Sequence, residues 1–217
     1  SGFILFATRS GKIKKTAVVD FRNYRKDGII AIKLDEGNEL IDVRLTSGSD
    51  DVVLITKSGL SLRFNEAQAR SQGRATSGVF GIRPRGEDCV IGLALVSDEQ
   101  KLLVASENGI GKRTSFDDYR QQSRGGKGVI TMKCTEKTGQ VVGAAAVADD
   151  DELMLMTTGG QSIRIRVSDV RETGRNAQGV KLVTLNDEEK LQDIAPVRES
   201  TEEEPNTEEP ETQETEE

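Results

Sequence analysis

The feature that most constrains this chain is a unit of about 50 residues that occurs four times. Its first landmark is a glycine in a polar turn, followed four residues later by a cation. This landmark lies in the segments TRSGKIKKT (8–16), TKSGLSLRF (56–64), SENGIGKRT (106–114) and TGGQSIRI (158–165). Intervals of 48, 50 and 51 residues separate its glycines, Gly11, Gly59, Gly109 and Gly160.

A second glycine keeps the same phase. It precedes a short apolar run in each unit, at Gly28, Gly78, Gly128 and Gly179. It follows the turn glycine by 17 residues in the first unit and by 19 in the other three. Two separate landmarks in register over four copies indicate a true repeat, in which each unit buries its faces against its neighbours.

Each unit is predicted to form four short strands. In the third unit we expect strands at 102–106, 110–114, 129–134 and 141–147, with a tight turn at Asn108-Gly109. The first two strands of other units are expected at 52–55, 60–64, 153–157 and 161–166. This period predicts an all-β, propeller-like fold with units at 1–41, 42–91, 92–142 and 143–198. Runs such as LMLM (153–156) and VVGAAAV (141–147) are expected to be buried on both faces.

The charge is distributed unevenly along the chain. The net charge is −7, but residues 199–217 hold ten of the 37 acidic residues and no Lys or Arg. Residues 1–198 therefore carry 30 basic and 27 acidic residues, a net charge of +3. The acidic tail at 199–217 is expected to be disordered, either as a solubilising segment or as a DNA mimic that competes for the basic surface.

Composition excludes several classes of function. The chain has no histidine, which excludes Ser-His-Asp and Cys-His machinery and zinc sites that use histidine. Asp149–Glu152 is interpreted as a solvated turn rather than a magnesium cluster, and the GK at 126–127 lacks the spacing of a nucleotide-binding loop. No apolar run approaches the ~20 residues that span a bilayer, so we expect no membrane contact and a cytoplasmic location.

Cations concentrate in the loop between the second and third strands of each unit. These loop cations are Arg22, Arg25, Lys26, Arg70, Arg74, Arg120, Arg124, Lys127, Arg171 and Arg175. A second group, expected to stand near the same rim, comprises Lys15, Arg63, Arg113 and Arg164, and Lys112 is also expected to bind DNA. Stacked units would bring these cations onto one curved rim, which suits a phosphate backbone better than bases. Gly125 and Gly126 are expected to point backbone N–H groups at a phosphate.

The segment Gln122-Ser123-Arg124-Gly125-Gly126-Lys127-Gly128 resembles the Q-R-R-G-G-K-G box of the DNA gyrase A subunit, differing at Ser123. Further segments are similar to the last four blades of that subunit's C-terminal domain, in the same order. They include FATRSGKIKKT, GVFGIRP, NGIGKRT and RVSDVRETGRNAQGV. The resemblance covers residues 3–197 and the acidic tail. It implies a β-pinwheel whose blades exchange strands, with double-stranded DNA bent around the basic rim, where Gln122 and Gly128 join the cations as DNA-binding residues.

The resemblance also implies a context. The chain would be part of an ATP-dependent type IIA topoisomerase, with the rest of the gyrase A subunit and the gyrase B subunit as partners, in association with the nucleoid. It would have no catalytic site and no cofactor of its own, since ATP and magnesium belong to other parts of the holoenzyme. The family's box lies in the first of six blades, so we expect a piece of a longer protein that forms an open arc.

Two alternatives remain open. The C-terminal domain of the topoisomerase IV A-type subunit shares the blades, but the GGKG segment and the acidic tail favour gyrase. A propeller that serves as a protein-interaction platform would need no DNA at all.

Overall fold

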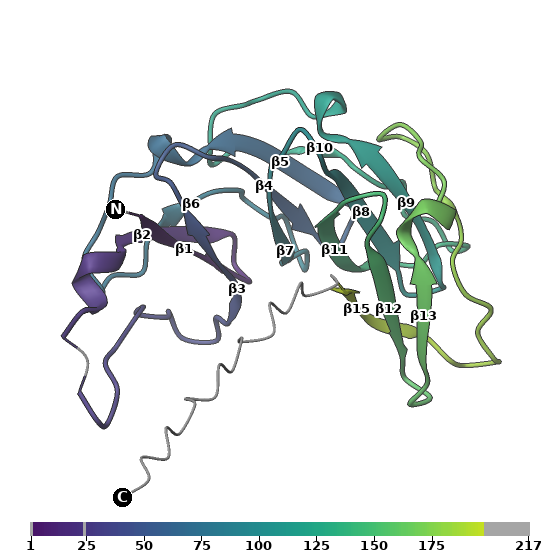
Figure 1. Cartoon of the computed structure of the whole chain (residues 1–217), viewed down its shortest axis with the longest axis horizontal. Helices are drawn as coiled ribbons and strands as arrows, with labels where there is room; N and C mark the ends of the chain where they lie inside the picture. The colour runs from purple at the N-terminus through teal and green to yellow at the C-terminus, as the bar shows by residue number, and fades with distance from the viewer. Residues whose placement is uncertain (1, 24, 198–217) are drawn as a thin grey trace, which may run out of the picture.

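The computed structural model describes residues 2–23 and 25–197, which form an open arc of four small antiparallel sheets (Figure 1). The predicted tail lies outside the described residues. The strands are β1 (Phe3–Thr8), β2 (Lys12–Ala17), β3 (Leu40–Thr46), β4 (Asp51–Thr56), β5 (Leu60–Asn65), β6 (Val79–Phe80), β7 (Val90–Leu95), β8 (Lys101–Ser106), β9 (Ile110–Ser115), β10 (Val129–Ile130), β11 (Val141–Val147), β12 (Glu152–Thr157), β13 (Ser162–Arg166), β14 (Val180–Lys181) and β15 (Leu191–Val197). Short 3-10 turns follow the second strand of each repeat, at Val18–Phe21, Glu66–Gln68, Phe116–Asp118 and Val167–Asp169.

Neighbouring repeats exchange a strand. The sheet orders are β3-β1-β2-β6, β10-β5-β4-β7, β11-β8-β9-β14 and β13-β12-β15. The short strand of each of the last three repeats therefore completes the sheet of the repeat before it. In all three cases a strand of two residues pairs with the start of the second strand, as Val129 pairs with Ser61 and Ile130 with Leu60. The all-β prediction and the exchange of strands are confirmed.

The second glycine of each of the last three repeats makes this exchange possible. Gly128 has φ +83°, and a Cβ at this position would lie 2.6 Å from the backbone oxygen of Ser61 in the preceding repeat. A side chain would be strained by the backbone conformation and would also collide with that strand. The sequence landmark is therefore a site of close backbone approach between repeats.

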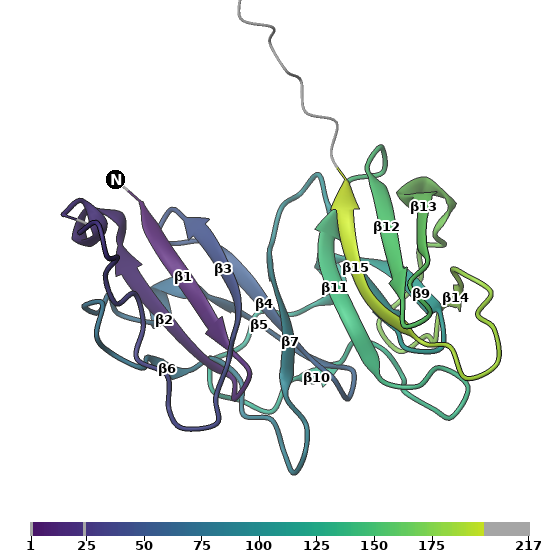
Figure 2. The same ribbon diagram turned by 90° about the horizontal axis from the view of Figure 1, so that it is seen from below.

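The sheets stand side by side with their fourth strands on the inside of the arc. β3, β7, β11 and β15 contact one another in sequence along the concave side, which Figure 2 shows from the open side of the arc. The exchanged strands β6, β10 and β14 lie at the opposite edge of their sheets from β3, β7 and β11. The loops that hold the predicted cations lead into these strands, so they lie on the convex side.

Apolar cores form between adjacent repeats rather than within them. The first core joins Leu5 and Ala7 to Val52 and Leu54, all with no exposed surface. Equivalent cores join the second repeat to the third and the third to the fourth. Each repeat is too thin to bury its own faces, and its stability depends on its neighbours. No helix among the described residues is long and apolar enough to cross a membrane.

Several predicted boundaries are wrong. The expected divisions after residues 41, 91 and 142 fall inside β3, β7 and β11. The strand expected at 129–134 has only two residues, because it pairs only where it meets the preceding repeat. The run at 153–156 is buried at Leu153 and Leu155 but only half-buried at Met154 and Met156.

Candidate nucleic-acid interface

The cations that follow the turn glycine by four residues hold adjacent repeats together. Arg63 pairs with Asp51 at 2.8 Å, and its Nη1 donates to the carbonyl oxygens of Phe116 and Tyr119 in the third repeat. Lys15 donates from Nζ to the carbonyl of Glu66 in the second repeat at 3.1 Å. These side chains are oriented along the arc, toward the next repeat.

Arg113 repeats this arrangement and is also buried. It is 7% exposed, its Nε donates to Val170 O at 2.7 Å, and its Nη1 pairs with Asp149. Lys15 is 6% exposed. The expectation that Lys15, Arg63 and Arg113 face the DNA rim is therefore wrong, because their donors already bind the carbonyls of the next repeat. Arg164, in the last repeat, is exposed and pairs with Glu152 of its own sheet.

A buried lysine makes a second contact between neighbouring repeats. Lys112 has no exposed surface, and its Nζ donates to Gly174 O at 2.7 Å and to Arg175 O at 2.6 Å. Lys14, the equivalent residue of the first repeat, donates to the carbonyls of Ala31 and Arg74. The expectation that Lys112 binds DNA is therefore wrong, because its buried amine is held by these two carbonyls.

The burial of these lysines makes stability depend on pH. Burial lowers the pKa of Lys14 and of Lys112 to about 8, and the nearby Arg74 and Arg175 act in the same direction. The unfolded chain therefore holds more protons than the folded one between about pH 8 and 10.5, so stability rises with pH across that window. We expect urea unfolding to show a gain on the order of 2 kcal/mol, since solvent close to the joints screens part of the effect.

A variant with both lysines replaced by methionine should lose this rise of stability with pH. If its free energy of unfolding depends on pH as that of the wild type does, the two lysines are not the cause of the rise. Apolar residues are tolerated here, since Leu62 and Ile163 stand at the equivalent positions of the second and fourth repeats.

One loop arginine in each of the last three repeats also binds the preceding repeat. The Nη1 of Arg74 donates to Ile30 O, that of Arg124 to Phe80 O and that of Arg175 to Ile130 O, at 2.9–3.1 Å. Each acceptor lies in the preceding repeat, two residues after its second glycine. These guanidinium groups stay partly exposed on the convex side, so they can join a phosphate only with their remaining donors.

The QSRGGKG segment (122–128) mainly holds its own repeat against the preceding repeat. The N–H of Gln122 donates to Arg63 O, and the N–H of Gly125 donates to Gly81 O at 2.6 Å. The carbonyl of Gly126 accepts from Arg83, also in the preceding repeat. The expectation that Gly125 points its N–H at a phosphate is wrong, because that donor is occupied. Lys127 is exposed, so it is the cation of this segment that can reach a ligand.

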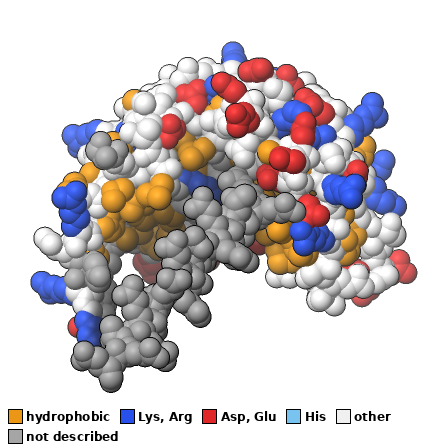
Figure 3. All heavy atoms as spheres, viewed as in Figure 1, with side chains coloured by type: hydrophobic (Ala, Val, Ile, Leu, Met, Phe, Trp, Pro, Cys, Tyr) orange, Lys and Arg blue, Asp and Glu red, His pale blue; other side chains and the backbone are white. Residues whose placement is uncertain are grey.

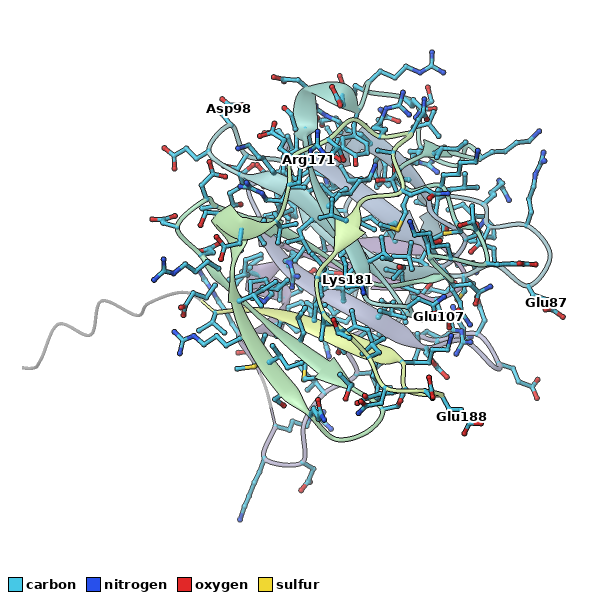
Figure 4. The ribbon with its side chains drawn as sticks, turned by 90° about the vertical axis from the view of Figure 1, so that its right-hand side faces the viewer. Glu87, Asp98, Glu107, Arg171, Lys181 and Glu188 are labelled. Atoms are coloured by element: carbon cyan, nitrogen blue, oxygen red, sulfur yellow. The ribbon has the colours of Figure 1, made fainter. Side chains whose placement is uncertain are left out.

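A row of arginines recurs in the loop between the second strand and the second glycine of each repeat. It follows the turn glycine by eleven residues in every repeat, and its members are Arg22, Arg70, Arg120 and Arg171. All four are exposed, and none pairs with an acidic side chain in the part of the chain that the structure describes. Figure 4 places Arg171 at the opposite end of the last repeat from Glu188, with Lys181 of β14 between them.

Sequence reasoning missed a second row, just after the outer strands. Its members follow the second glycine by five residues: Lys33, Arg83 and Lys133, with Thr184 in the last repeat. All three cations are exposed, and Arg83 lies over the ring of Phe80 at 4.1 Å. The sequence does contain a signal for this second row, since a cation recurs at a fixed distance from the second glycine in three repeats.

The two rows flank the convex edge, and Arg25, Lys26 and Lys127 add exposed cations between them. In Figure 3 Lys and Arg side chains project from both flanks of the arc, Asp and Glu side chains are also present along its top, and apolar side chains lie on the inner side near both ends. Within residues 2–23 and 25–197 no group of three or more acidic or cysteine side chains is arranged to hold a metal ion. The convex edge therefore carries exposed cations at positions that recur with the repeat, with acidic side chains among them.

Comparison with known proteins identifies the family of the chain. The family described as DNA gyrase C-terminal domain, beta-propeller, matches at residues 2–47, 50–97, 100–148 and 151–198. The chain belongs to the DNA gyrase C-terminal domain family. The DNA gyrase A subunit of Deinococcus deserti is 47% identical over 93% of the chain, and that of Salmonella typhimurium is 43% identical over 93%. The chain spans 25% and 23% of these two relatives.

Solved structures show the same fold. A DNA gyrase A C-terminal domain superposes with a TM-score of 0.80 at 30% identity, covering 90% of this chain and 65% of that one. The C-terminal domain of a DNA topoisomerase IV gives 0.85 at 25% identity, covering 90% and 62%. The gyrase domain and the topoisomerase IV domain thus share one architecture, and the higher sequence identity lies with the gyrase relatives.

Proposed function

We propose that this gyrase domain binds duplex DNA along its convex edge and bends the DNA around the arc, without catalysing a reaction itself. The observation that carries the proposal is the pair of exposed cation rows that recur in phase with the repeats. Regular spacing of charge matches a phosphate backbone and provides no code for bases. In the longer A subunit, bending of this kind would support ATP-dependent negative supercoiling by gyrase, together with the gyrase B subunit.

The affinity for duplex DNA should fall steeply with salt. If about eight phosphates are neutralised, the slope of log affinity against log salt concentration should be about −7. Binding titrations with a linear duplex between about 50 and 300 mM salt measure it. A slope near zero would contradict DNA binding and would favour the protein-interaction platform instead.

Bending into a wrap is tested separately from binding. Nicked plasmid is religated in the presence of the protein, and its linking number is compared with that of plasmid religated alone. We expect a positive shift that grows with protein concentration and falls with salt. Steep salt-dependent binding without any shift would leave a DNA-binding module that does not wrap.

A further inference from the structure

The loop that leads into β14 in the fourth repeat is held by a lysine of the third repeat. The Nζ of Lys112 donates to Gly174 O at 2.7 Å and to Arg175 O at 2.6 Å. Lys112 has no exposed surface, so its amine lies beneath the loop. The loop begins at the exposed Arg171, which is labelled in Figure 4, and ends at β14.

The same arrangement occurs one joint earlier in the arc. Lys14 of the first repeat is 1% exposed, and its Nζ donates to Arg74 O in the loop of the second repeat. Both loops carry arginines of the DNA surface proposed above, among them Arg70 and Arg171. In both cases, therefore, an amine that does not reach solvent holds the backbone of a loop whose side chains do.

A lysine is not required to support such a loop. Leu62 occupies the position of Lys112 in the second repeat, and the loop of the third repeat packs directly on it. A Cβ on Gly126 would lie 3.1 Å from the Cδ1 of Leu62. Burying an ammonium group costs free energy that an apolar side chain avoids. A buried lysine at the position of a leucine therefore indicates a role for its charge.

We propose that Lys112 is a positioning residue for DNA binding, whose ammonium group holds the loop in the conformation that presents Arg171 to the phosphate backbone. The inference rests on the DNA-binding function proposed above. Charge-assisted hydrogen bonds are roughly twice as strong as those of a neutral donor, so the protonated amine holds the loop more firmly. Its positive charge also attracts a phosphate bound above the loop without touching it. The protonated form is thus the one that favours DNA binding.

The charge of Lys112 changes with pH in a range that is accessible to experiment. Burial lowers the pKa of Lys112 to about 8, Arg175 of the loop acts in the same direction, and Asp118 of the neighbouring 3-10 turn opposes them. Arg63, which reaches this joint from the second repeat, is paired with Asp51.

The neighbouring Tyr119 stays neutral in this range, because burial raises its pKa. Lys14 is affected as Lys112 is, by burial and by Arg74, with Asp20 opposing. Because the DNA-bound state favours the charged amine, the affinity for DNA should be full below about pH 8 and should fall as the pH rises through that value. Stability rises over the same range, so a weakened fold cannot explain weakened binding.

Fluorescence anisotropy with a labelled linear duplex at constant salt tests the proposal. Between about pH 7 and 9.5 the affinity of the wild type should fall about tenfold, shared between the two lysines. Lys112→Met should bind about threefold less tightly than the wild type near pH 7 and equally near pH 9.5, because methionine has no charge to lose. The ratio of the two affinities should therefore approach one as the pH rises.

Thr114→Val is the matched control. The Oγ1 of Thr114 donates to Thr173 O of the same loop at 2.9 Å, but threonine has no charge that changes in this range. Its loss weakens the support of the loop equally at every pH. The affinity of this variant should therefore run parallel to that of the wild type across the whole range.

Three results would overturn the proposal. A constant ratio of wild-type to Lys112→Met affinity at all pH values would show that the lysine acts only through the fold. An affinity that does not fall with pH, while the steep salt dependence near pH 7 is intact, would overturn it and leave the DNA-binding function in place. Absence of any DNA binding near pH 7 would overturn both.

A second measurement uses the unaltered chain and so does not depend on the folding of a variant. Calorimetric titration with the same duplex near pH 8.5, in two buffers of different ionisation enthalpy, counts the protons exchanged on binding. Binding should take up protons, since DNA raises the charged fraction of the buried lysines. Binding without proton uptake would overturn the proposal, and Lys112→Met should take up about half as many protons as the wild type.

Discussion

Replacing Arg113 by methionine should lower the free energy of unfolding by about 3 kcal/mol, because it removes a buried charge that joins two repeats. Its guanidinium binds Val170 O, Ser168 O and Asp149. Without it these carbonyls lose their donor inside the joint. Urea unfolding followed by circular dichroism measures the change.

Arg164→Met is the matched control. This arginine occupies the same position in the last repeat, where its side chain is 52% exposed and Glu152 is its one acidic partner among the described residues. Its loss should cost less than about 1 kcal/mol, as is usual for an exposed ion pair. Equal losses in the two variants would show that the contacts across the joint contribute nothing. A changed salt slope for DNA binding in folded Arg113→Met would show instead that this arginine reaches phosphate.

The second large effect is expected on DNA affinity. Changing Arg22, Arg70, Arg120 and Arg171 to glutamine should weaken binding by about two orders of magnitude near 100 mM salt and reduce the salt slope by about 3 to 4. These side chains are exposed, so their removal leaves the joints intact. The loss should be similar for duplexes of different sequence, because phosphate contacts carry no base information.

A control with the same change in net charge uses four exposed cations near the hairpin turns: Arg9, Arg85, Lys137 and Lys190. Glutamine at these positions should leave the salt slope nearly unchanged. If both quadruple variants lose affinity equally, binding depends on net charge and not on the rows beside the convex edge. Fluorescence anisotropy with a labelled duplex distinguishes the two results.

The sequence was sufficient to predict the repeat, its strands and the position of its cations in the loops. Gly11 and Gly128 recur because backbone geometry demands them, so they keep a period that can be read directly. The four-strand unit at a period near 50 then predicted propeller-like blades. The exact start of each repeat could not be read, because a period gives the length of a unit and not the point at which it begins, and the expected divisions fell inside the inner strands β3, β7 and β11.

The division of the cations into structural and free could not be predicted. Arg63 and Arg70 lie seven residues apart, and both are arginines in a repeated position. One is held by carbonyl oxygens of the next repeat and the other is exposed, and no property of the residue type separates them. Whether an arginine is held or exposed depends on which backbone carbonyls the neighbouring repeat brings near it, and this is known only from the tertiary structure. The same reason explains Gly125, whose donor is occupied by the preceding repeat.

The exchanged strand also decides where this protein can be cut. A truncation that follows the sequence period, for example after residue 47, would leave the sheet of β1 and β2 without β6, which lies at Val79–Phe80. A piece that contains one complete sheet must extend well into the next repeat, so it necessarily carries unfinished structure at its end. Deleting or adding a repeat therefore succeeds only when both cuts fall at equivalent positions of two repeats. The segment that can be gained or lost in this architecture is thus one that runs between equivalent positions of two repeats, and not a single complete sheet.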